Sequence, residues 1–207
     1  MNRNFILRLI RALALSIICC YFPACSSDEH VNAAPVTAMS HQWAAEINLP
    51  GVPNFHKVSD DLYRGAQPSE EGFRQLEKSG VKTVVNLRAF HSDRDKLKGT
   101  NLNYEHINMT AWHPENEEVV RFLKIAADAN LTPVFVHCQR GADRTGTMCA
   151  IYRVAVQGWS KDEAIEEMTK GGFEFYSMWQ NLIDYIRGLD IEKIKRQVGI
   201  EASIDDN

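Results

Sequence analysis

The fold of this chain is decided by residues 133–146, which read PVFVHCQRGADRTG. The first five residues are a short, mostly apolar run, which is typical of a buried strand. A helix is expected from Thr145 to Val156, so the residues between form a tight loop at the end of the strand. Gly141 permits backbone angles and a close approach that a side chain would forbid. The stretch therefore predicts a strand, a sharp loop and a helix in direct succession.

The loop between this strand and this helix is suited to hold an anion. Its backbone N–H groups can turn toward one point, and a helix N-terminus adds positive potential there. The same surroundings stabilise a thiolate, the nucleophilic form of cysteine, at Cys138. Arg144 follows six residues later, and its planar guanidinium can bind two phosphate oxygens at once. We therefore expect Cys138 and Arg144 to be catalytic. The residues expected to bind the substrate are Gln139, Arg140, Gly141, Ala142 and Thr145, and Thr145 can also donate a hydrogen bond to the sulfur.

The order His-Cys, five residues, Arg, Thr resembles the signature of the protein-tyrosine and dual-specificity phosphatase superfamily. Residues 62–68 (LYRGAQP) and 84–88 (VVNLR) are similar to the start of its compact atypical dual-specificity group. The resemblance implies a phosphotyrosine phosphatase-like fold. It also implies two steps without a cofactor: thiolate attack on phosphorus, then hydrolysis of the cysteinyl-phosphate by water. The substrate would be a phosphorylated protein or a small phosphomonoester.

Strands and helices alternate along the rest of the chain. Short strands are expected within residues 55–63, 81–87 and 102–107, and an exposed loop or short helix over 91–100. Helices are expected from Ser69 to Gly80, from Glu115 to about Ala127, and over 161–169, 176–188 and 191–198. The pattern predicts an α/β domain with a central, mostly parallel sheet of four to five strands flanked by helices.

The superfamily resemblance also implies an aspartate, on a separate loop ahead of the cysteine, that protonates the leaving oxygen. The corresponding residues 107–115 read INMTAWHPE and contain no aspartate. Asp143 is the first candidate, because its place before Arg144 is similar to the in-loop aspartate of myotubularin-like and Sac-type lipid phosphatases. Glu115 and His113 are the alternatives. Each also has a structural interpretation: Asp143 can orient the loop, Glu115 can favour a helix N-terminus, and His113 can be a surface residue.

The charges of the loop bear on the substrate class. Arg140 is offset by Asp143, which disfavours a highly phosphorylated inositol and favours phosphotyrosine or another phosphomonoester. Trp112 and His113 could line the entrance, although a tryptophan before a helix more often anchors the core. Two other functions compete: a phosphate-binding pseudophosphatase, because the usual aspartate is missing, and a rhodanese-like sulfurtransferase, which the Arg144-Thr145 pair argues against. Arsenate reductase is a remoter alternative.

The N-terminus has the pattern of an export signal. Three arginines, Arg3, Arg8 and Arg11, precede an apolar run over residues 12–22 that is too short to span a bilayer comfortably. A small residue before Cys25 resembles the bacterial lipoprotein cleavage site, with ordinary secretion and an uncleaved membrane helix as alternatives. We therefore divide the chain into a signal peptide (1–24), a flexible tether (25–50), a phosphatase domain (51–198) and a tail (199–207). The protein is expected in the bacterial periplasm or on a membrane, tethered through Cys25.

The remaining composition excludes several classes of site. Only Cys138 and Cys149 lie beyond the presumed signal and its end, so the chain is not a disulfide scaffold. Cys149 is expected in the core, with a redox partner of Cys138 as the alternative. A net charge of −4 gives no basic excess for a nucleic-acid partner. The histidines show no close-paired spacing, so no metal site is expected.

Overall fold

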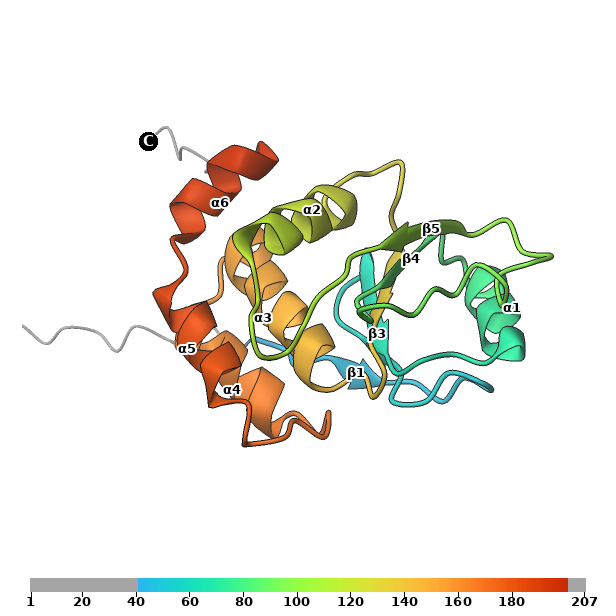
Figure 1. Cartoon of the computed structure of the whole chain (residues 1–207), viewed down its shortest axis with the longest axis horizontal. Coiled ribbons are helices and arrows are strands. Elements are labelled where there is room, and N and C mark those ends of the chain that lie inside the picture. The colour runs from blue at the N-terminus through green and yellow to red at the C-terminus, as the bar shows by residue number, and fades with distance from the viewer. Residues whose placement is uncertain (1–40, 201–207) are drawn as a thin grey trace, which may run out of the picture. The chain divides into compact units, whose positions relative to one another are not determined.

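The computed structural model describes residues 41–200, which form one mixed sheet with helices on both faces (Figure 1). The strands are β1 (Ala45–Glu46), β2 (His56–Lys57), β3 (Leu62–Gly65), β4 (Thr83–Asn86), β5 (Asn103–His106) and β6 (Val134–His137). Their order is β1-β2-β3-β6-β4-β5. The last four in this order run parallel, while β1 and β2 pair antiparallel at one edge. The predicted fold class is therefore confirmed, with six strands in place of four to five.

The extra strand, β1, lies in the segment that we expected to be a tether. Ala45 and Glu46 pair with β2, and the amide of Ala44 donates a 2.7 Å hydrogen bond to Glu167 Oε1. The tether prediction is thus wrong for residues 41–50. A two-residue exposed strand carries no periodicity, so its partners cannot be inferred from its own sequence. The predicted signal peptide, Cys25 and residues 201–207 lie outside the described part of the chain.

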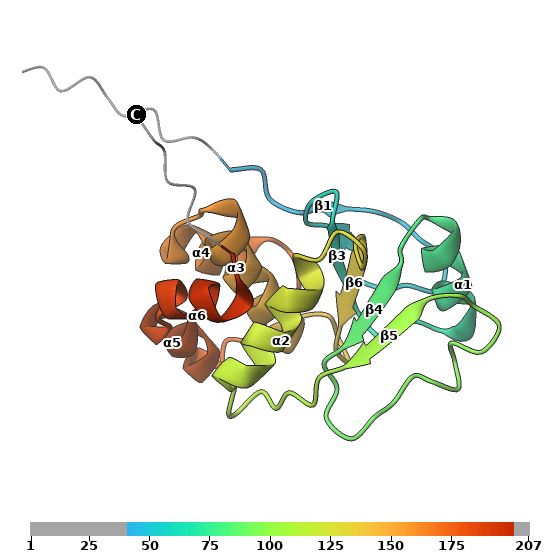
Figure 2. The ribbon, with the colours of Figure 1, turned by 90° about the horizontal axis from the view of Figure 1, so that it is seen from above.

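The helices cover the two faces of the sheet unequally. They are α1 (Glu70–Lys78), α2 (Asn116–Ala126), α3 (Asp143–Gln157), α4 (Lys161–Lys170), α5 (Gln180–Gly188) and α6 (Ile191–Val198). Figure 2 shows α1 alone on one side of β4 and β5, with the other helices on the opposite side. Within residues 41–200, none of these helices combines the length and apolar character needed to cross a bilayer.

Alternating residues of the central strands divide the core into two layers. Val84 and Phe135 pack with Phe73 and Leu76 of α1, whereas their strand neighbours, such as Val85, join the cluster under the other helices. Successive side chains of a strand point to opposite faces, which produces this division. Each fully buried side chain of this kind stabilises the fold by about 1.5–3 kcal/mol.

Helix boundaries agree with the sequence where a local cap sets them. Ser69 caps α1 as expected, with its Oγ accepting a 3.1 Å hydrogen bond from the Gly72 amide. By contrast, α5 begins at Gln180, four residues after the expected start at Tyr176. The Tyr176 amide instead donates to Asp143 Oδ1 at 2.9 Å. This long-range contact keeps residues 171–179 as a loop beside the start of α3.

Candidate active site

The carboxyl ends of the parallel strands meet at one edge of the sheet, where ligands bind in open α/β folds. Cys138 directly follows β6 at this edge and is 2% exposed. Residues 138–144, here called the Cys138 loop, run from the end of β6 into the first turn of α3. The expected strand, loop and helix are thus present, with α3 starting two residues earlier than predicted.

Two glycines allow the Cys138 loop to approach the turn after β3. Gly141 has a φ of +72°, and a Cβ on it would lie 2.4 Å from the carbonyl carbon of Gly65. No side chain fits at that distance. The Gln67 amide also donates to the carbonyl oxygen of Gln139 at 3.3 Å. The role expected for Gly141 is therefore seen directly in this packing.

Arg64 supports the Cys138 loop from inside the protein. Its guanidinium is buried, donates a 2.7 Å hydrogen bond to the Gly141 carbonyl and lies 3.8 Å from the centre of the Phe173 ring. From the sequence alone, Arg64 is only part of the stretch 62–68 and has no assigned role. An arginine in an otherwise apolar, buried strand was the signal that could have identified it, because such a charge needs a partner.

The first turn of α3 offers unpaired backbone donors to a ligand. Its N-cap is Ala142, which has no side-chain oxygen to accept from the first amides. Alanine at this position lowers the stability of the helix by about 1 kcal/mol relative to a capping residue. Free amides at a helix start are also what binds an anion. The buried Thr145 hydroxyl has no hydrogen-bond partner among residues 41–200, so the expected bond to the Cys138 sulfur is not formed.

Arg144 is half-buried and reaches across the edge of the sheet. Its Nη1 lies 3.4 Å from the carbonyl oxygens of both Leu87 and Met109, which follow β4 and β5. These contacts are long and weak. They hold the guanidinium at the strand ends while leaving most of its donors available to a ligand. Gln139 and Arg140 are exposed on the loop, whereas Ala142 is buried.

The three candidates for the general acid lie in different surroundings. Asp143 is the first residue of α3, half-buried, with Oδ1 bound to the Tyr176 amide. Glu115 is the N-cap of α2, where its amide donates to Glu118 Oε2 at 3.0 Å. His113 is exposed, 3.9 Å from Glu115. Only Asp143 belongs to the Cys138 loop, and the structure places the other two at the start of α2.

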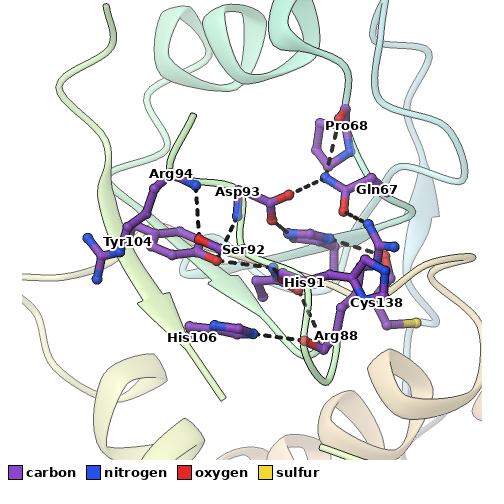
Figure 3. A network of polar contacts seen from close by, with 12 residues as sticks. Gln67, Pro68, Arg88, His91, Ser92, Asp93, Arg94, Tyr104, His106 and Cys138 are labelled. Carbon is purple, nitrogen blue, oxygen red and sulfur yellow. Dashed lines mark hydrogen bonds and ion pairs between the residues drawn. The ribbon is translucent and has the colours of Figure 1, made fainter. Parts of the chain in front are cut away.

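A buried polar network lies behind Cys138 (Figure 3). His137 Nδ1 is 3.1 Å from the Cys138 carbonyl oxygen, and its Nε2 is 3.0 Å from Asp93 Oδ2. Gln67 donates to Asp93 Oδ1 at 2.7 Å and accepts from Arg88 Nη1 at 2.6 Å. Asp93 is 1% exposed. The exposed loop expected over 91–100 is therefore wrong at Asp93, because a polar residue is buried here by its partners.

Three exposed aromatic side chains lie on loops at the edge of the sheet where Cys138 lies. Trp112 and Phe90 are 70% and 88% exposed, and they follow β5 and β4 on the same edge as Cys138. Tyr176 is half exposed, next to Asp143. The interpretation of Trp112 as a core anchor is thus wrong.

Cys149 lies in the core as expected. Burial raises the pKa of the Cys149 thiol to about 11. Residues 41–200 hold no group of three or more His, Cys, Asp or Glu side chains suited to a metal ion.

Comparison with known proteins identifies the family. The family model described as "PTP-NADK: DSP-PTPase phosphatase fused to NAD+ Kinase" matches residues 49–183. The dual specificity protein phosphatase TpbA of Pseudomonas aeruginosa (strain UCBPP-PA14) is 33% identical over 75% of this chain and 71% of its own length. An inositol diphosphatase of Arabidopsis thaliana is 26% identical over 73% of this chain and 76% of its own.

A solved structure shows the same fold and a ligand. The crystal structure of a cysteine-to-serine variant of P. aeruginosa TpbA in complex with phosphotyrosine has a TM-score of 0.69 and 30% identity, covering 79% of this chain and 99% of that chain. The signature loop, the sheet topology and the relatives agree. The chain therefore belongs to the dual-specificity phosphatase-like family and is a cysteine-dependent phosphatase of the compact atypical group.

Proposed function

We propose that this phosphatase hydrolyses phosphotyrosine or a similar aryl phosphomonoester, with Cys138 as nucleophile and Arg144 as the cation that binds the phosphate. The observation that carries the proposal is the buried Cys138 next to an uncapped helix start and a half-buried Arg144. The Cys138 sulfur attacks phosphorus, the ester oxygen leaves with a proton, and water then hydrolyses the cysteinyl-phosphate. Arg144 and the amides of the loop stabilise the charge that develops on the phosphoryl oxygens.

The aromatic side chains at the entrance favour an aromatic leaving group. Phe90, Trp112 and Tyr176 present exposed ring surface on three loops around the Cys138 edge. Exposed rings at a binding site provide apolar contact and stacking for another ring. Phe90 has a φ of +61°, which a non-glycine residue adopts only where its surroundings hold it. The phosphotyrosine complex of TpbA supports the same preference.

The charge of the surface beside the loop disfavours a substrate with many phosphates. Arg140 Nη2 lies 3.5 Å from Glu174 Oε2, so its charge is partly neutralised. A groove of about 700 Å³ borders Gln139 and Arg140, and its lining includes the carboxylates of Glu46 and Glu174. A polyphosphorylated inositol would meet repulsion there. This argument weighs against inositol diphosphates, despite the Arabidopsis relative.

For the location, we propose export from a bacterial cytoplasm, based on the charged start and apolar run of residues 1–24. Residue Cys25 is the candidate for lipidation. Fractionation of expressing cells, with and without Cys25→Ala, would test it. Recovery of the full chain in the cytoplasm would exclude export, and a periplasmic wild type that is free of membranes would exclude the lipid anchor.

The function is tested with the purified protein and a panel of substrates. The panel contains a phosphotyrosine peptide, a phosphothreonine peptide, p-nitrophenyl phosphate and an inositol diphosphate. We expect the highest kcat/KM for the phosphotyrosine peptide and no turnover by Cys138→Ser. Binding of the peptide without hydrolysis by the wild type would support a pseudophosphatase instead. Turnover that survives Cys138→Ser would exclude the proposed nucleophile.

A further inference from the structure

The buried pair of Asp93 and His137 has no part in the chemistry described so far. Asp93 Oδ2 and His137 Nε2 are 3.0 Å apart, in side chains that are 1% and 0% exposed. This is the distance of an ion pair, and neither atom has another partner among residues 41–200. A carboxylate oxygen offers only lone pairs, so two buried atoms this close are stable only with a proton between them.

The second ring nitrogen of His137 faces an acceptor as well. Nδ1 is 3.1 Å from the backbone carbonyl oxygen of Cys138, which cannot donate a hydrogen bond. Acceptors at both nitrogens would be satisfied together only by a ring that carries two protons and therefore a positive charge. That charge belongs to the residue directly before Cys138, in the interior, where attraction to a sulfur anion is stronger than in water.

Two further contacts hold Asp93 in place, and a third holds its partner Gln67. Its Oδ1 accepts from Gln67 at 2.7 Å, and its amide donates to the Tyr104 hydroxyl at 3.0 Å. Arg88 in turn donates to Gln67 at 2.6 Å. Burial by itself would raise the pKa of Asp93, but the contacts with His137 and Gln67 and the charge of Lys96 hold it below the ordinary value. The carboxylate therefore stays ionised at neutral pH.

Other charged or titratable groups lie near the pair or near the Cys138 loop. They are Arg64 on β3, Arg88 after β4, Lys96 in the turn that follows Asp93, Tyr104 on β5, and Arg144 and Cys149 on α3. Arginine and lysine side chains ordinarily keep their charge up to about pH 9. Cys149, with a pKa of about 11, stays neutral over the same range. These surrounding groups therefore keep their charge states around neutral pH.

We propose that Asp93 is a positioning residue of this active site: it keeps His137 as an imidazolium, which holds the Cys138 backbone and stabilises the Cys138 thiolate. The inference rests on the proposed role of Cys138. Asp93 acts only through His137 and touches no reacting atom. Without the Asp93 carboxylate, His137 would lose its positive charge. The Cys138 thiolate would then lose the stabilisation that this charge, on the neighbouring residue, provides.

The test compares full-length wild type with Asp93→Asn, His137→Asn, the double variant and Tyr104→Phe. The rate of alkylation of Cys138 by iodoacetamide is measured against pH by peptide mapping, so the readout does not depend on turnover. We expect Asp93→Asn to move the midpoint up by about one pH unit, a shift typical of losing a nearby opposite charge. At pH values below the midpoint, kcat/KM of Asp93→Asn should be about tenfold lower than that of the wild type. At high pH the kcat/KM values of these two proteins should become equal.

The other variants separate positioning from a merely structural role. His137→Asn should shift the midpoint similarly, and Asp93→Asn should add nothing to it, because the two residues act in one chain. Tyr104→Phe loosens the same segment without touching the charge, so it should lower Tm and keep the wild-type midpoint. An unchanged midpoint in Asp93→Asn, or shifts that add in the double variant, would overturn the proposal.

A second measurement applies even where Asp93→Asn does not fold. Nitrogen-15 NMR of the wild type should show protons on both ring nitrogens of His137 at neutral pH. A neutral ring in the folded protein would overturn the inference. The Cys138→Ser variant distinguishes failure of the proposed function from failure of this inference. If that variant still turned over substrate, Cys138 would not be the nucleophile, whatever protonation state the NMR spectrum shows for His137.

Discussion

The guanidinium of Arg64 lies buried against the Cys138 loop and donates a hydrogen bond of 2.7 Å to the carbonyl oxygen of Gly141. The same group stacks on the Phe173 ring at 3.8 Å. Arg64 belongs to β3, the parallel neighbour of β6, so the register of these two strands sets its position. The shape of the catalytic loop thus depends on a charge held inside the core.

Replacing Arg64 should therefore weaken both the fold and the site. Lysine keeps the charge but lacks the flat guanidinium needed for stacking on Phe173. We expect Arg64→Lys to lower the free energy of unfolding by about 2 kcal/mol, the scale of a lost buried hydrogen bond to a charged group. Urea denaturation measures this change in stability. The affinity for vanadate, a phosphate analogue, shows whether the Cys138 loop keeps its anion-binding shape. Wild-type stability and wild-type vanadate affinity together would contradict a supporting role for Arg64.

Gly141 gives a prediction with a matched control. Alanine there would need a Cβ 2.4 Å from the Gly65 carbonyl carbon, in addition to a φ of +72°. At Gly158, which has a φ of +73°, an added Cβ meets nothing within 4 Å. Gly158→Ala should lower stability by about 1–2 kcal/mol through backbone strain alone.

Gly141→Ala should cost more stability than this control, because the clash is with backbone that cannot rotate away. Its kcat/KM should also fall by about 100-fold or more, since small displacements of a catalytic loop have effects of that size. Circular dichroism melts and phosphatase assays on both variants measure the difference. Equal losses in the two variants would show that the close approach to Gly65 is unimportant.

The sequence was sufficient where local residues determine the structure. Ser69 predicts its own cap, and residues 134–137 predict a buried strand by their apolar side chains. The Cys138 loop was recognisable because its glycine, arginine and threonine stand at fixed spacing. Each of these signals lies within a few positions of the feature that it specifies, so one chain read alone contains it.

The missed features depend on partners that are distant in the sequence. Asp93 is buried because His137, 44 residues later, and Gln67 meet it in space. Its neighbours are polar, so the segment resembled a surface loop. Tyr176 appeared to begin a helix, yet Asp143 holds its amide. Such pairings follow from the strand order β3-β6-β4-β5, which no local pattern specifies.

The Asp93 carboxylate should also make stability depend on pH in a defined window. Its pKa in the folded protein lies below the ordinary value of 3.8. A carboxyl group with a depressed pKa stabilises the fold above its unfolded pKa and loses this effect as pH falls through the folded pKa. We therefore expect the contribution of the Asp93 carboxyl to the stability difference between wild type and Asp93→Asn to be fully present above about pH 5 and to be lost as the pH falls below 3.8. A difference that grows in acid would contradict the depressed pKa.

Cys149 should behave as a core residue. A thiol with a pKa of about 11 is almost entirely protonated at pH 7, and the protonated form is a poor nucleophile. Iodoacetamide should therefore modify Cys138 in the native protein and Cys149 only after unfolding, as peptide mapping can show. Cys149→Ala should leave the rate of inactivation by peroxide unchanged. A change in that rate would favour the redox partnership instead.

The general acid is the last open role, and Asp143→Asn tests it with the surrounding structure preserved. Asparagine keeps an oxygen that can accept from the Tyr176 amide, so the loop over residues 171–179 stays anchored, but it cannot supply a proton. We expect kcat for a phenyl phosphate with a poor leaving group to fall about 100-fold, a scale typical of general acid catalysis, and kcat for p-nitrophenyl phosphate to change little.

Glu115→Gln is the matched control for this prediction. It also replaces a carboxylate by an amide near the entrance, at the N-cap of α2, where a structural role accounts for the residue. Its effect should be small and equal on both substrates, because a cap does not depend on the leaving group. A loss confined to the poor leaving group in Glu115→Gln, with equal losses in Asp143→Asn, would transfer the role of acid from Asp143 to Glu115. Wild-type rates in both variants would leave His113 as the remaining candidate.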